Sequence, residues 1–385
     1  MVKKLTINYF IVFSIGLSVG FSSVVWAKNP NMAVSKRDSN GDGKVSLSEW
    51  EKPEFVFRKI DFNSDGFITA NEFARKWGIP MSGESSTERS VDEAGALDES
   101  NVIIADVHMH PHPGNHPIDQ LTWMNRNGVM WAGSGSMSRH ALDHYARVMK
   151  NRFIPFGAQG EMHQIYNQHG VSGVEDNQTQ LFESMMSNLE SQFENSEIKG
   201  IGELFINNRT TNPKHSMRRK TRVDAQSYKD LLDLVANYGG VLSVHVQWDY
   251  DSIEQLQALA DHNPAGNIIW AHCGNDGSAS QVREILQNHD NLYCDLAARH
   301  RPKLNDWVIN NRPNAQIFTS YSLDRSWKDL IESMPDRFMV GTDTKTESHY
   351  DQGINNIRNG LLANLNPETA EKVAYKNAQT LLNLK

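Results

Sequence analysis

Six residues of this chain have side chains that commonly bind metal ions, and each stands at the end of a short apolar run. Two histidines occupy positions i and i+2 in the segment Asp106-Val107-His108-Met109-His110. Side chains two apart on a strand point to the same face, so both imidazoles can reach one ion. The candidate metal ligands are His108, His110, Glu203, His245, His272 and Asp343. Imidazole and carboxylate ligands suit Zn²⁺ or another divalent transition metal, and an open coordination position allows such an ion to activate water.

The apolar runs that carry these residues alternate with longer amphipathic segments from residue 101 onward. This alternation is typical of a parallel sheet covered by helices. The predicted strands are 102–108, 128–132, 153–157, 200–205, 241–246, 267–271, 291–296 and 337–341. Helical apolar spacing is found in the segments 180–193, 228–238, 253–262 and 279–287.

Eight strand–helix units between residues 101 and 385 predict an α/β fold of the TIM (β/α)8 barrel type, which builds its site at the C-terminal ends of the strands. A doubly wound sheet is the alternative. The segment Gly200-Ile201-Gly202 lacks the third glycine of the nucleotide-binding fingerprint, which disfavours that alternative.

The constellation resembles the amidohydrolase superfamily, in particular its amidohydrolase-related branch, family 2. The resemblance covers about residues 102–385 and rests on His108-Met109-His110, on Gly200-Ile201-Gly202-Glu203, and on the segments 268–274 and 337–343. It implies that His108 and His110 bind the more buried ion, with Asp343 beside it. His245 and His272 would bind a second ion or contact the substrate.

Two points of chemistry also follow from the resemblance. Glu203 stands where many relatives have a carboxylated lysine, which leaves open whether the protein holds one ion or two. Catalysis is assigned to Asp343, His245 and His272, with a metal-activated water as the nucleophile. Asp343 would take the proton from water and pass it to the leaving group.

Near the amino terminus, two twelve-residue segments have the spacing of calcium-binding loops. Both have oxygen-bearing side chains at positions 1, 3, 5 and 9, a glycine at 6 and a glutamate at 12, and both resemble EF-hand loops. The predicted ligands of two Ca²⁺ ions are Asp38, Asn40, Asp42, Lys44, Ser46 and Glu49 in the first loop and Asp61, Asn63, Asp65, Phe67, Thr69 and Glu72 in the second. Lys44 and Phe67 would bind through their backbone carbonyls.

The two loops are separated by only 11 residues, 50–60. We therefore expect a single helix to leave the first loop and lead into the second. Val45 and Ile68 are expected to pair the loops through a short apolar bridge. This compact arrangement favours a structural or docking module over a switch.

The overall composition indicates a water-soluble globular protein. The 385 residues carry 38 Lys and Arg against 46 Asp and Glu, a formal net charge of −8, and 39% are hydrophobic. These values exclude a disordered chain, a collagen-like chain and a polytopic membrane protein. The acidic balance also argues against a general nucleic-acid binder.

Residues 1–27 predict a secretory signal peptide, because Lys3 and Lys4 precede an apolar stretch that ends in Val25-Trp26-Ala27. The expected localisation is periplasmic or secreted, with no stable membrane insertion after cleavage. An uncleaved membrane anchor is the alternative. The predicted domains are the signal peptide, an EF-hand pair at 28–80, an acidic linker at 81–100 and the barrel at 101–385.

Some residues outside the metal constellation carry weaker predictions. Arg299 and Arg301 follow the seventh strand, where a guanidinium could bind a substrate carboxylate or phosphate. Cys273 and Cys294 lie on neighbouring strands and are expected to be a reduced, buried pair, although export would permit a disulfide. The basic run at 214–222 is expected to be an exposed loop.

Together these features predict an exported metal-dependent hydrolase that cleaves an ester, lactone or amide-type bond in a small-molecule substrate. One alternative is a zinc-dependent decarboxylase on the same barrel. Another is a calcium-dependent binding protein that docks to a partner through its EF-hand module.

Overall fold

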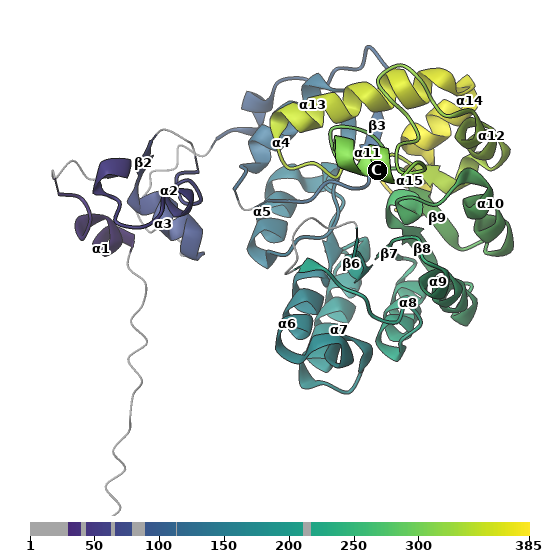
Figure 1. Cartoon of the computed structure of the whole chain (residues 1–385), viewed down its shortest axis with the longest axis horizontal. Coiled ribbons are helices and arrows are strands. Elements are labelled where there is room, and N and C mark those ends of the chain that lie inside the picture. Colours follow the sequence, from purple (N-terminus) through teal and green to yellow (C-terminus); the bar gives the residue numbers. More distant parts are fainter. Residues whose placement is uncertain (1–29, 40–43, 63–65, 79–88, 113, 211–216) are drawn as a thin grey trace, which may run out of the picture. The chain divides into compact units, whose positions relative to one another are not determined.

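A computed structural model describes residues 30–39, 44–62, 66–78, 89–112, 114–210 and 217–385. The chain divides into two compact units, Met1–Glu84 and Ser85–Lys385 (Figure 1). The predicted signal peptide lies outside the described residues. Within those residues, no helix has both the length and the apolar character needed to cross a membrane.

The smaller unit is built around a short antiparallel strand pair. Strands β1 (Val45–Ser46) and β2 (Phe67–Ile68) pair Val45 with Ile68, which confirms the predicted apolar bridge. The other elements are α1 (Pro30–Ser35), η1 (Leu47–Glu49), α2 (Glu54–Phe57) and α3 (Ala70–Trp77). Their buried core consists of Ala33, Val34, Val45, Trp50, Phe57, Ile60, Ile68 and Phe73.

The two loops of this unit are closed in the same way by their last glutamates. Glu49 accepts hydrogen bonds from the backbone amides of Ser39 at 3.0 Å and Ser46 at 2.8 Å. Glu72 accepts the equivalent bonds from Phe62 at 2.9 Å and Thr69 at 2.8 Å. Four of the other predicted calcium ligands, Asn40, Asp42, Asn63 and Asp65, lie outside the described residues.

The prediction of one continuous helix between the loops is wrong. The first helical turn, η1, ends at Glu49, and α2 begins only at Glu54. Pro53 stands at the N-cap of α2. A proline has no backbone N–H and disfavours a helical conformation in the residue before it, so the segment breaks there.

The larger unit contains, within its described residues, eight parallel strands at the eight predicted places. They are β3 (Ile104–Asp106), β4 (Val129–Ala132), β5 (Phe156–Gly157), β6 (Gly200–Asn207), β7 (Val241–Val246), β8 (Asn267–Trp270), β9 (Leu292–Asp295) and β10 (Phe338–Met339). All six residues of β7 are buried, as expected for a strand covered on both faces. The fold is the predicted TIM barrel.

Strands β5 to β10 form one sheet in sequence order, and β3 pairs with β4 in another. Backbone contacts join the two sheets on both sides. Ala132 bridges to Phe153, and the Val107 amide donates to the Val340 carbonyl at 3.1 Å. The eight strands therefore meet as a barrel requires.

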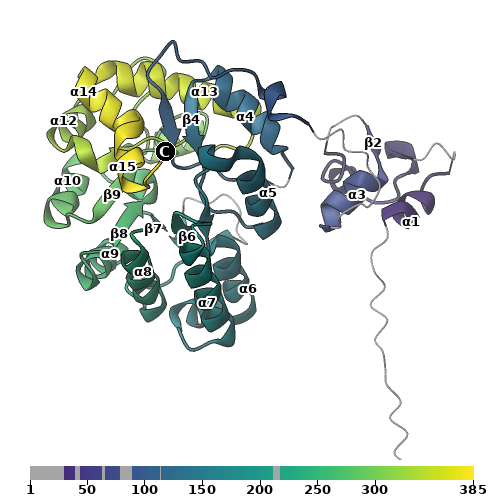
Figure 2. The ribbon, with the colours of Figure 1, turned by 180° about the vertical axis from the view of Figure 1, so that it is seen from behind.

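Helices surround the strands (Figures 1 and 2). The longer ones are α4 (Pro117–Arg126), α5 (Arg139–Met149), α6 (Gln159–Glu175), α7 (Gln180–Glu194), α8 (Gln226–Tyr238), α9 (Tyr250–His262), α10 (Ala279–Asn288), α12 (Arg325–Ser333) and α13 (Glu347–Asn356). Shorter ones are η3 (Lys150–Arg152), η5 (Ala271–Gly274), α11 (Asp306–Asn311), η6 (Pro335–Arg337), η7 (Ile357–Leu361), η8 (Leu362–Asn364), α14 (Pro367–Glu371), η9 (Lys372–Lys376) and α15 (Asn377–Leu381). The predicted helices at 180–193, 228–238, 253–262 and 279–287 correspond to α7 to α10.

The carboxy-terminal segment closes one end of the barrel. Leu382 and Leu384 belong to a buried cluster with Trp131, Ile154 and Met339. The Trp131 indole donates to the Lys385 carbonyl at 3.3 Å. This end is packed with apolar side chains, so chemistry is confined to the opposite, C-terminal end of the strands.

The predicted acidic linker at 81–100 is wrong for its second half. Residues 91–94 form the short helix η2 (Val91–Ala94), and the Asn125 side chain donates to the carbonyls of Ala94 and Gly95. Arg89 pairs with Asp119 on α4 at 2.6 Å. These contacts make residues 89–100 part of the larger unit, whereas 79–88 lie outside the described residues.

Candidate metal centre

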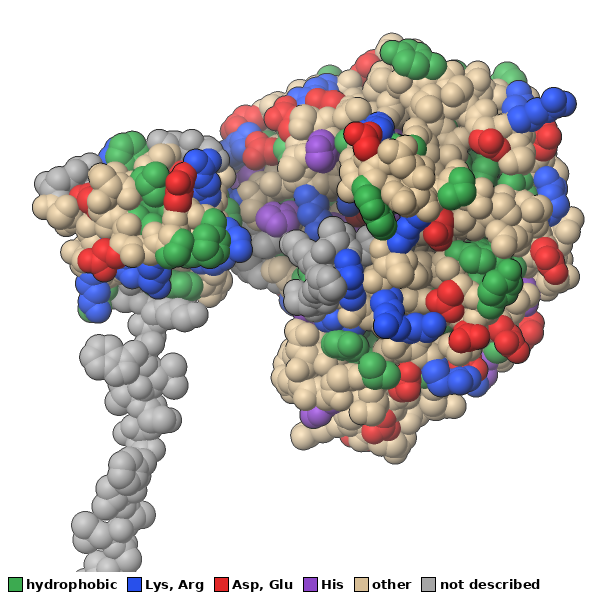
Figure 3. Space-filling view, in the orientation of Figure 1, with side chains coloured by type: hydrophobic (Ala, Val, Ile, Leu, Met, Phe, Trp, Pro, Cys, Tyr) green, Lys and Arg blue, Asp and Glu red, His purple; other side chains and the backbone are tan. Residues whose placement is uncertain are grey.

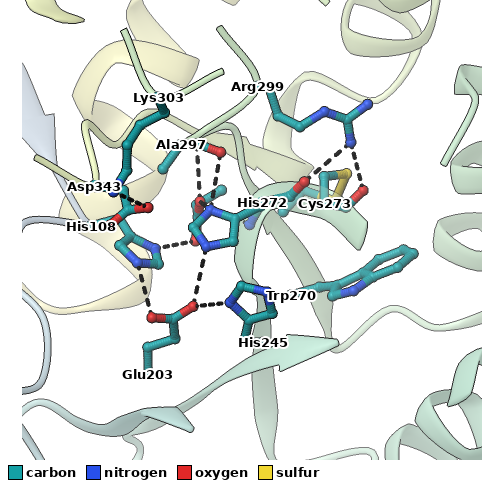
Figure 4. Close-up of polar contacts among 12 residues, drawn as sticks. His108, Glu203, His245, Trp270, His272, Cys273, Ala297, Arg299, Lys303 and Asp343 are labelled. Atoms are coloured by element: carbon teal, nitrogen blue, oxygen red, sulfur yellow. Dashed lines mark hydrogen bonds and ion pairs between the residues drawn. A yellow bond between two sulfur atoms is a disulfide. The ribbon is translucent and has the colours of Figure 1, made fainter. Parts of the chain in front are cut away.

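The six predicted metal ligands are brought to one end of the barrel by five separate segments of the chain. His108 and His110 follow β3, Glu203 lies on β6 and His245 on β7. His272 lies in η5, directly after β8, and Asp343 follows β10. Figure 4 shows most of these side chains facing one another.

The Glu203 carboxylate stands at the middle of the four histidines. One oxygen, Oε1, lies 2.6 Å from His245 Nδ1 and 3.1 Å from His272 Nε2. The other, Oε2, lies 3.4 Å from His108 Nε2 and 3.3 Å from His110 Nε2. Burial by itself would raise the pKa of Glu203, but the adjacent His108 and His245 hold that pKa well below its usual value. The carboxylate is therefore ionised and ready to act as a ligand.

Asp343 also lies beside His110. Its Oδ1 is 3.6 Å from His110 Nε2, and its Oδ2 is 2.8 Å from Lys303 Nζ. Burial opposes ionisation, but Lys303 and His108 keep the pKa of Asp343 well below its usual value. Lys303 was not predicted, because it lies in a loop beyond β9. No local sequence pattern indicates that this loop folds back to the site.

Asp295, at the end of β9, was also missed as a site residue. Its Oδ2 lies 2.9 Å from His108 Nδ1, and its Oδ1 accepts bonds from the amides of His272 at 3.1 Å and Ala297 at 3.0 Å. The sequence did contain a signal for this residue, because Asp295 lies near the end of a predicted strand, as Asp106 and the metal ligands do. Such a carboxylate fixes the orientation and tautomer of a metal-binding imidazole.

Asp106 plays a comparable part behind β3. It accepts bonds from the Thr342 amide at 2.9 Å, the Thr342 hydroxyl at 2.7 Å and the His108 amide at 3.2 Å. Burial raises the pKa of Asp106 to about 6. The contacts tie the segment that carries Asp343 to the one that carries His108 and His110.

The hydrogen bonds of the histidines test whether a metal fits here. His110 Nδ1 lies 3.0 Å from the Gly135 carbonyl, and His272 Nδ1 lies 3.0 Å from the Ala297 carbonyl. The Asp295 carboxylate is the corresponding acceptor beside His108 Nδ1. An oxygen acceptor requires an N–H on Nδ1, so in a neutral imidazole the lone pair is on Nε2, which faces inward. The Nε2 atoms of His108 and His110 lie only 3.1 Å apart. Two facing lone pairs at this distance repel, and either a proton or a metal ion between them removes the repulsion. The 3.1 Å spacing is short enough for one divalent ion to bind both nitrogens, so the residues fit a bound ion.

The donors form three overlapping groups of possible ligands. They are His108, His110 and Asp343; Glu203, His245 and His272; and His108, His272 and Asp295. All are nitrogen and oxygen donors, the chemistry of zinc and similar divalent ions. The first two groups share no member, so the donor set can hold one ion or two.

The substrate-binding prediction for Arg299 is wrong. Its side chain is fully buried and donates to the backbone carbonyls of His272, Cys273, Gly277, Asn314 and Ala315. Burial lowers the pKa of Arg299 to about 9. Its guanidinium holds the segment after β8 in place. Arg301 is exposed and pairs with Asp306, so it provides no further support for a substrate contact.

The expectation of reduced cysteines is also wrong. Cys273 and Cys294 form a disulfide with a Cα–Cα distance of 4.9 Å. The two residues adjoin His272 and Asp295 in sequence, so the bond ties together the ends of β8 and β9 that carry these side chains.

His300 provides a pH-dependent prediction for the loop after β9. It is fully buried, and its ring stacks on Phe318 with 4.4 Å between centroids. Burial lowers the pKa of His300 to about 4 from an ordinary value of 6.5. As the pH falls below 6.5, the unfolded chain takes up this proton before the folded chain does. Stability is therefore lost between pH 6.5 and 4, by about 3 kcal/mol for such a shift.

We expect His300→Phe to remove this part of the acid sensitivity, because phenylalanine keeps the ring contact and cannot be protonated. Chemical unfolding of the full chain at several pH values between 7 and 4 measures it. His349→Phe, at an exposed histidine, is the control and should leave the pH slope unchanged. Identical slopes for wild type and His300→Phe would show that His300 is not responsible.

Comparison with known families agrees with this geometry. Residues 208–384 match the amidohydrolase family, and residues 37–56 and 54–75 match the EF hand. Over residues 208–384 the larger unit is therefore similar to amidohydrolases, and the smaller unit is similar to EF-hand pairs. The similarity indicates an enzyme of the metal-dependent hydrolase type. The amidohydrolase match includes His245, His272 and Asp343, and the barrel brings His108, His110 and Glu203 beside them.

Similar solved structures come from several amidohydrolase-type proteins. A dihydroorotase from Campylobacter jejuni is 16% identical, with a TM-score of 0.44, over 73% of this chain and 83% of its own. A probable 2-pyrone-4,6-dicarboxylic acid hydrolase from Acinetobacter baumannii is 10% identical, with a TM-score of 0.46, over 73% and 99%. A 2,6-dihydroxybenzoate decarboxylase from Rhizobium is 11% identical, with a TM-score of 0.39, over 74% and 99%. No curated protein matches the sequence.

Proposed function

We propose that the protein is an exported hydrolase that cleaves an ester, lactone or amide-type bond in a small molecule. The observation that carries this proposal is the placement of Asp343 beside the histidines. It is a carboxylate kept ionised, 3.6 Å from His110 and 2.8 Å from Lys303, at the mouth of a barrel otherwise lined by buried ligands.

His108, His110, Glu203, His245, His272 and Asp343 would hold one or two divalent ions. A bound ion of this kind supplies Lewis-acid activation of water and of the substrate carbonyl. Asp343 accepts the proton released by the attacking water and returns it to the leaving group. Lys303 holds the Asp343 carboxylate toward the reacting atoms. Asp295 keeps His108 in the tautomer whose Nε2 can bind a metal ion.

Export is supported by two independent features. The first 27 residues have the pattern of a signal peptide. The disulfide between Cys273 and Cys294 is of a kind that persists in oxidising compartments.

The test begins with elemental analysis of the purified mature chain, which should contain one or two equivalents of a zinc-class metal in addition to calcium. The metal-loaded chain is then assayed against panels of esters, lactones and amides, with carbon dioxide release followed in parallel on aromatic carboxylates. Bond hydrolysis supports the proposal. Carbon dioxide release without hydrolysis would make the protein a decarboxylase, and the absence of metal after gentle purification would count against the centre.

The EF-hand pair leads to a prediction about calcium. Glu49 and Glu72 occupy the last loop positions, where a carboxylate supplies two oxygens to Ca²⁺. Hydrogen bonds from Ser46, and then from Ser39, lower the pKa of Glu49 to about 2, so this ligand is ionised at neutral pH. We expect Glu49→Gln and Glu72→Gln each to reduce calcium binding from two equivalents to one.

Calorimetric titration of the full chain with calcium measures this stoichiometry. The matched control is Glu51→Gln, because Glu51 is exposed and lies outside both loops. Two equivalents in both glutamine variants would contradict the assignment.

A further inference from the structure

A second feature at the mouth of the barrel is a large cationic cavity. It has a volume of about 790 Å³, and the described residues that line it are Tyr166 on α6, residues 209–210 and 218–220 after β6, Trp307 on α11 and Arg312. No acidic residue is found among the described residues that line it, and five of its eight lining residues are cationic: Arg209, Arg218, Arg219, Lys220 and Arg312. Figure 3 shows Lys and Arg side chains gathered near the middle of this face of the larger unit. Two of these cations have acidic neighbours outside the lining, because Lys220 lies 3.4 Å from Asp249 and Arg312 lies 3.9 Å from Asp276. The chain as a whole has a formal net charge of −8, so a lining with only cationic charged groups differs in sign from the protein's overall charge.

One of these cations is fixed inside the protein, which corrects the expectation of a simple exposed basic loop. Arg219 is only 4% exposed. Its guanidinium stands 3.6 Å from the centre of the Tyr166 ring, and its NH2 group lies 3.1 Å from His163 Nδ1. A guanidinium held in one orientation can bind a carboxylate, sulfate or phosphate group with little further loss of conformational entropy.

The cavity also has an apolar wall. Trp307, on α11, lines it and is 62% exposed. Arg312, at the end of the same helix, donates to the Thr210 carbonyl at 2.6 Å, which ties this wall to the segment after β6. An exposed indole beside several cations suits a ligand that carries both a ring or other flat face and negative charge.

The cavity adjoins the metal centre through shared residues. Arg219 and Tyr166 also line a smaller cavity, whose lining includes Gln159 and Phe205. Gln159 donates to the Glu203 carbonyl at 3.0 Å, and the Phe205 ring lies 6.0 Å from the His245 ring.

We propose that this cavity binds the non-reacting part of the substrate, and that the substrate is a ring-bearing organic anion with two or more negatively charged oxygen groups. The volume suits a ligand of drug-like size. Positive charge at the mouth raises the local concentration of anions and orients them before reaction. The inference rests on the proposed function, since it makes the cavity a specificity site for the same chemistry.

The test measures binding by calorimetry, with metal-free full chain so that the probes cannot bind at the metal centre. Benzenetricarboxylate, benzenetrisulfonate and inositol trisphosphate separate the three kinds of anionic group. Benzenetrimethanol is the uncharged counterpart. At least one anion should bind, more tightly than the uncharged ring and more weakly as salt is added.

Arg209 is exposed and lines the cavity, so a change there should not disturb folding. We expect Arg209→Glu to weaken binding of the preferred anion by about tenfold or more, the effect of losing a charged hydrogen bond and adding repulsion. Arg209→Lys should recover part of that loss. The matched control is Arg147→Glu, at an exposed position in the last turn of α5, which should bind as wild type.

Equal binding of benzenetrimethanol, unchanged affinity in Arg209→Glu, or no binding of any anion would overturn the inference. These outcomes are separate from those of the hydrolysis assays. Hydrolysis without anion binding would leave the proposed function standing and remove only the inference. Anion binding without hydrolysis of any substrate would remove the proposed function and, with it, the role of the cavity as a substrate site, leaving an anion-binding cavity.

Discussion

Replacing Asp343 by asparagine is expected to lower kcat by about 10³-fold, within the range measured for the loss of a general acid–base group. Asparagine has nearly the same shape but cannot accept the proton from water. The position of the backbone should not change, because it is held by the bond from the Asp343 amide to the His108 carbonyl.

Asp343 is the carboxylate of the centre that can meet a substrate. Its side chain is 16% exposed, whereas those of Glu203 and Asp295 are 2% and 1% exposed. The two buried carboxylates are surrounded by imidazoles and backbone amides. A proton released by a reaction at the open end of the barrel therefore reaches Asp343 before it reaches Glu203 or Asp295.

The measurement is kcat and KM of the metal-loaded chain on the best substrate from the hydrolysis screen, with metal content determined in the same samples. Asp290→Asn, at a fully exposed aspartate that pairs with Arg337, is the control and should have wild-type kinetics. Near wild-type kcat in Asp343→Asn with full metal occupancy would remove Asp343 from the proton transfer.

The barrel could be predicted from sequence because its strands are covered on both faces and are therefore continuous apolar runs. The ligands could be predicted for the same reason, since each interrupts or ends such a run with a group that is costly to bury without a partner. His245 illustrates this, because it is the one ionisable residue of the wholly buried strand β7.

The errors and omissions lie where the decisive contact comes from a distant segment. Lys303 reaches Asp343 across 40 residues of sequence, and Arg299 is satisfied by carbonyls from several separate positions. No spacing rule encodes these contacts. The broken helix in the EF-hand pair is a different case, because Pro53 was visible in the sequence. A proline at this position prevents one continuous helix between the two loops, although the short spacing of the loops favours one.

Glu203→Gln is expected to remove at least one equivalent of metal and to reduce turnover by about 10²-fold or more, as metal sites that lose a ligand or its orienting partner commonly do. The Glu203 carboxylate lies within 3.4 Å of one nitrogen of each of the four histidines, so it is the common neighbour of the donor groups. Glutamine keeps the shape but removes the negative charge. Its amide N–H₂ would also replace one carboxylate oxygen and donate a hydrogen bond to an imidazole nitrogen, so that this nitrogen would no longer be available to a metal ion.

The result distinguishes one ion from two. If Glu203 bridges two ions, wild type should contain two equivalents of metal and Glu203→Gln one or none. If a single ion is bound, wild type contains one equivalent and the variant loses it. Elemental analysis of both proteins, with circular dichroism to verify folding, gives the answer, and Glu161→Gln at the start of α6 is a matched control that should retain the wild-type content. Full wild-type metal content and turnover in Glu203→Gln would mean that the negative charge amid the four histidines does not hold the metal.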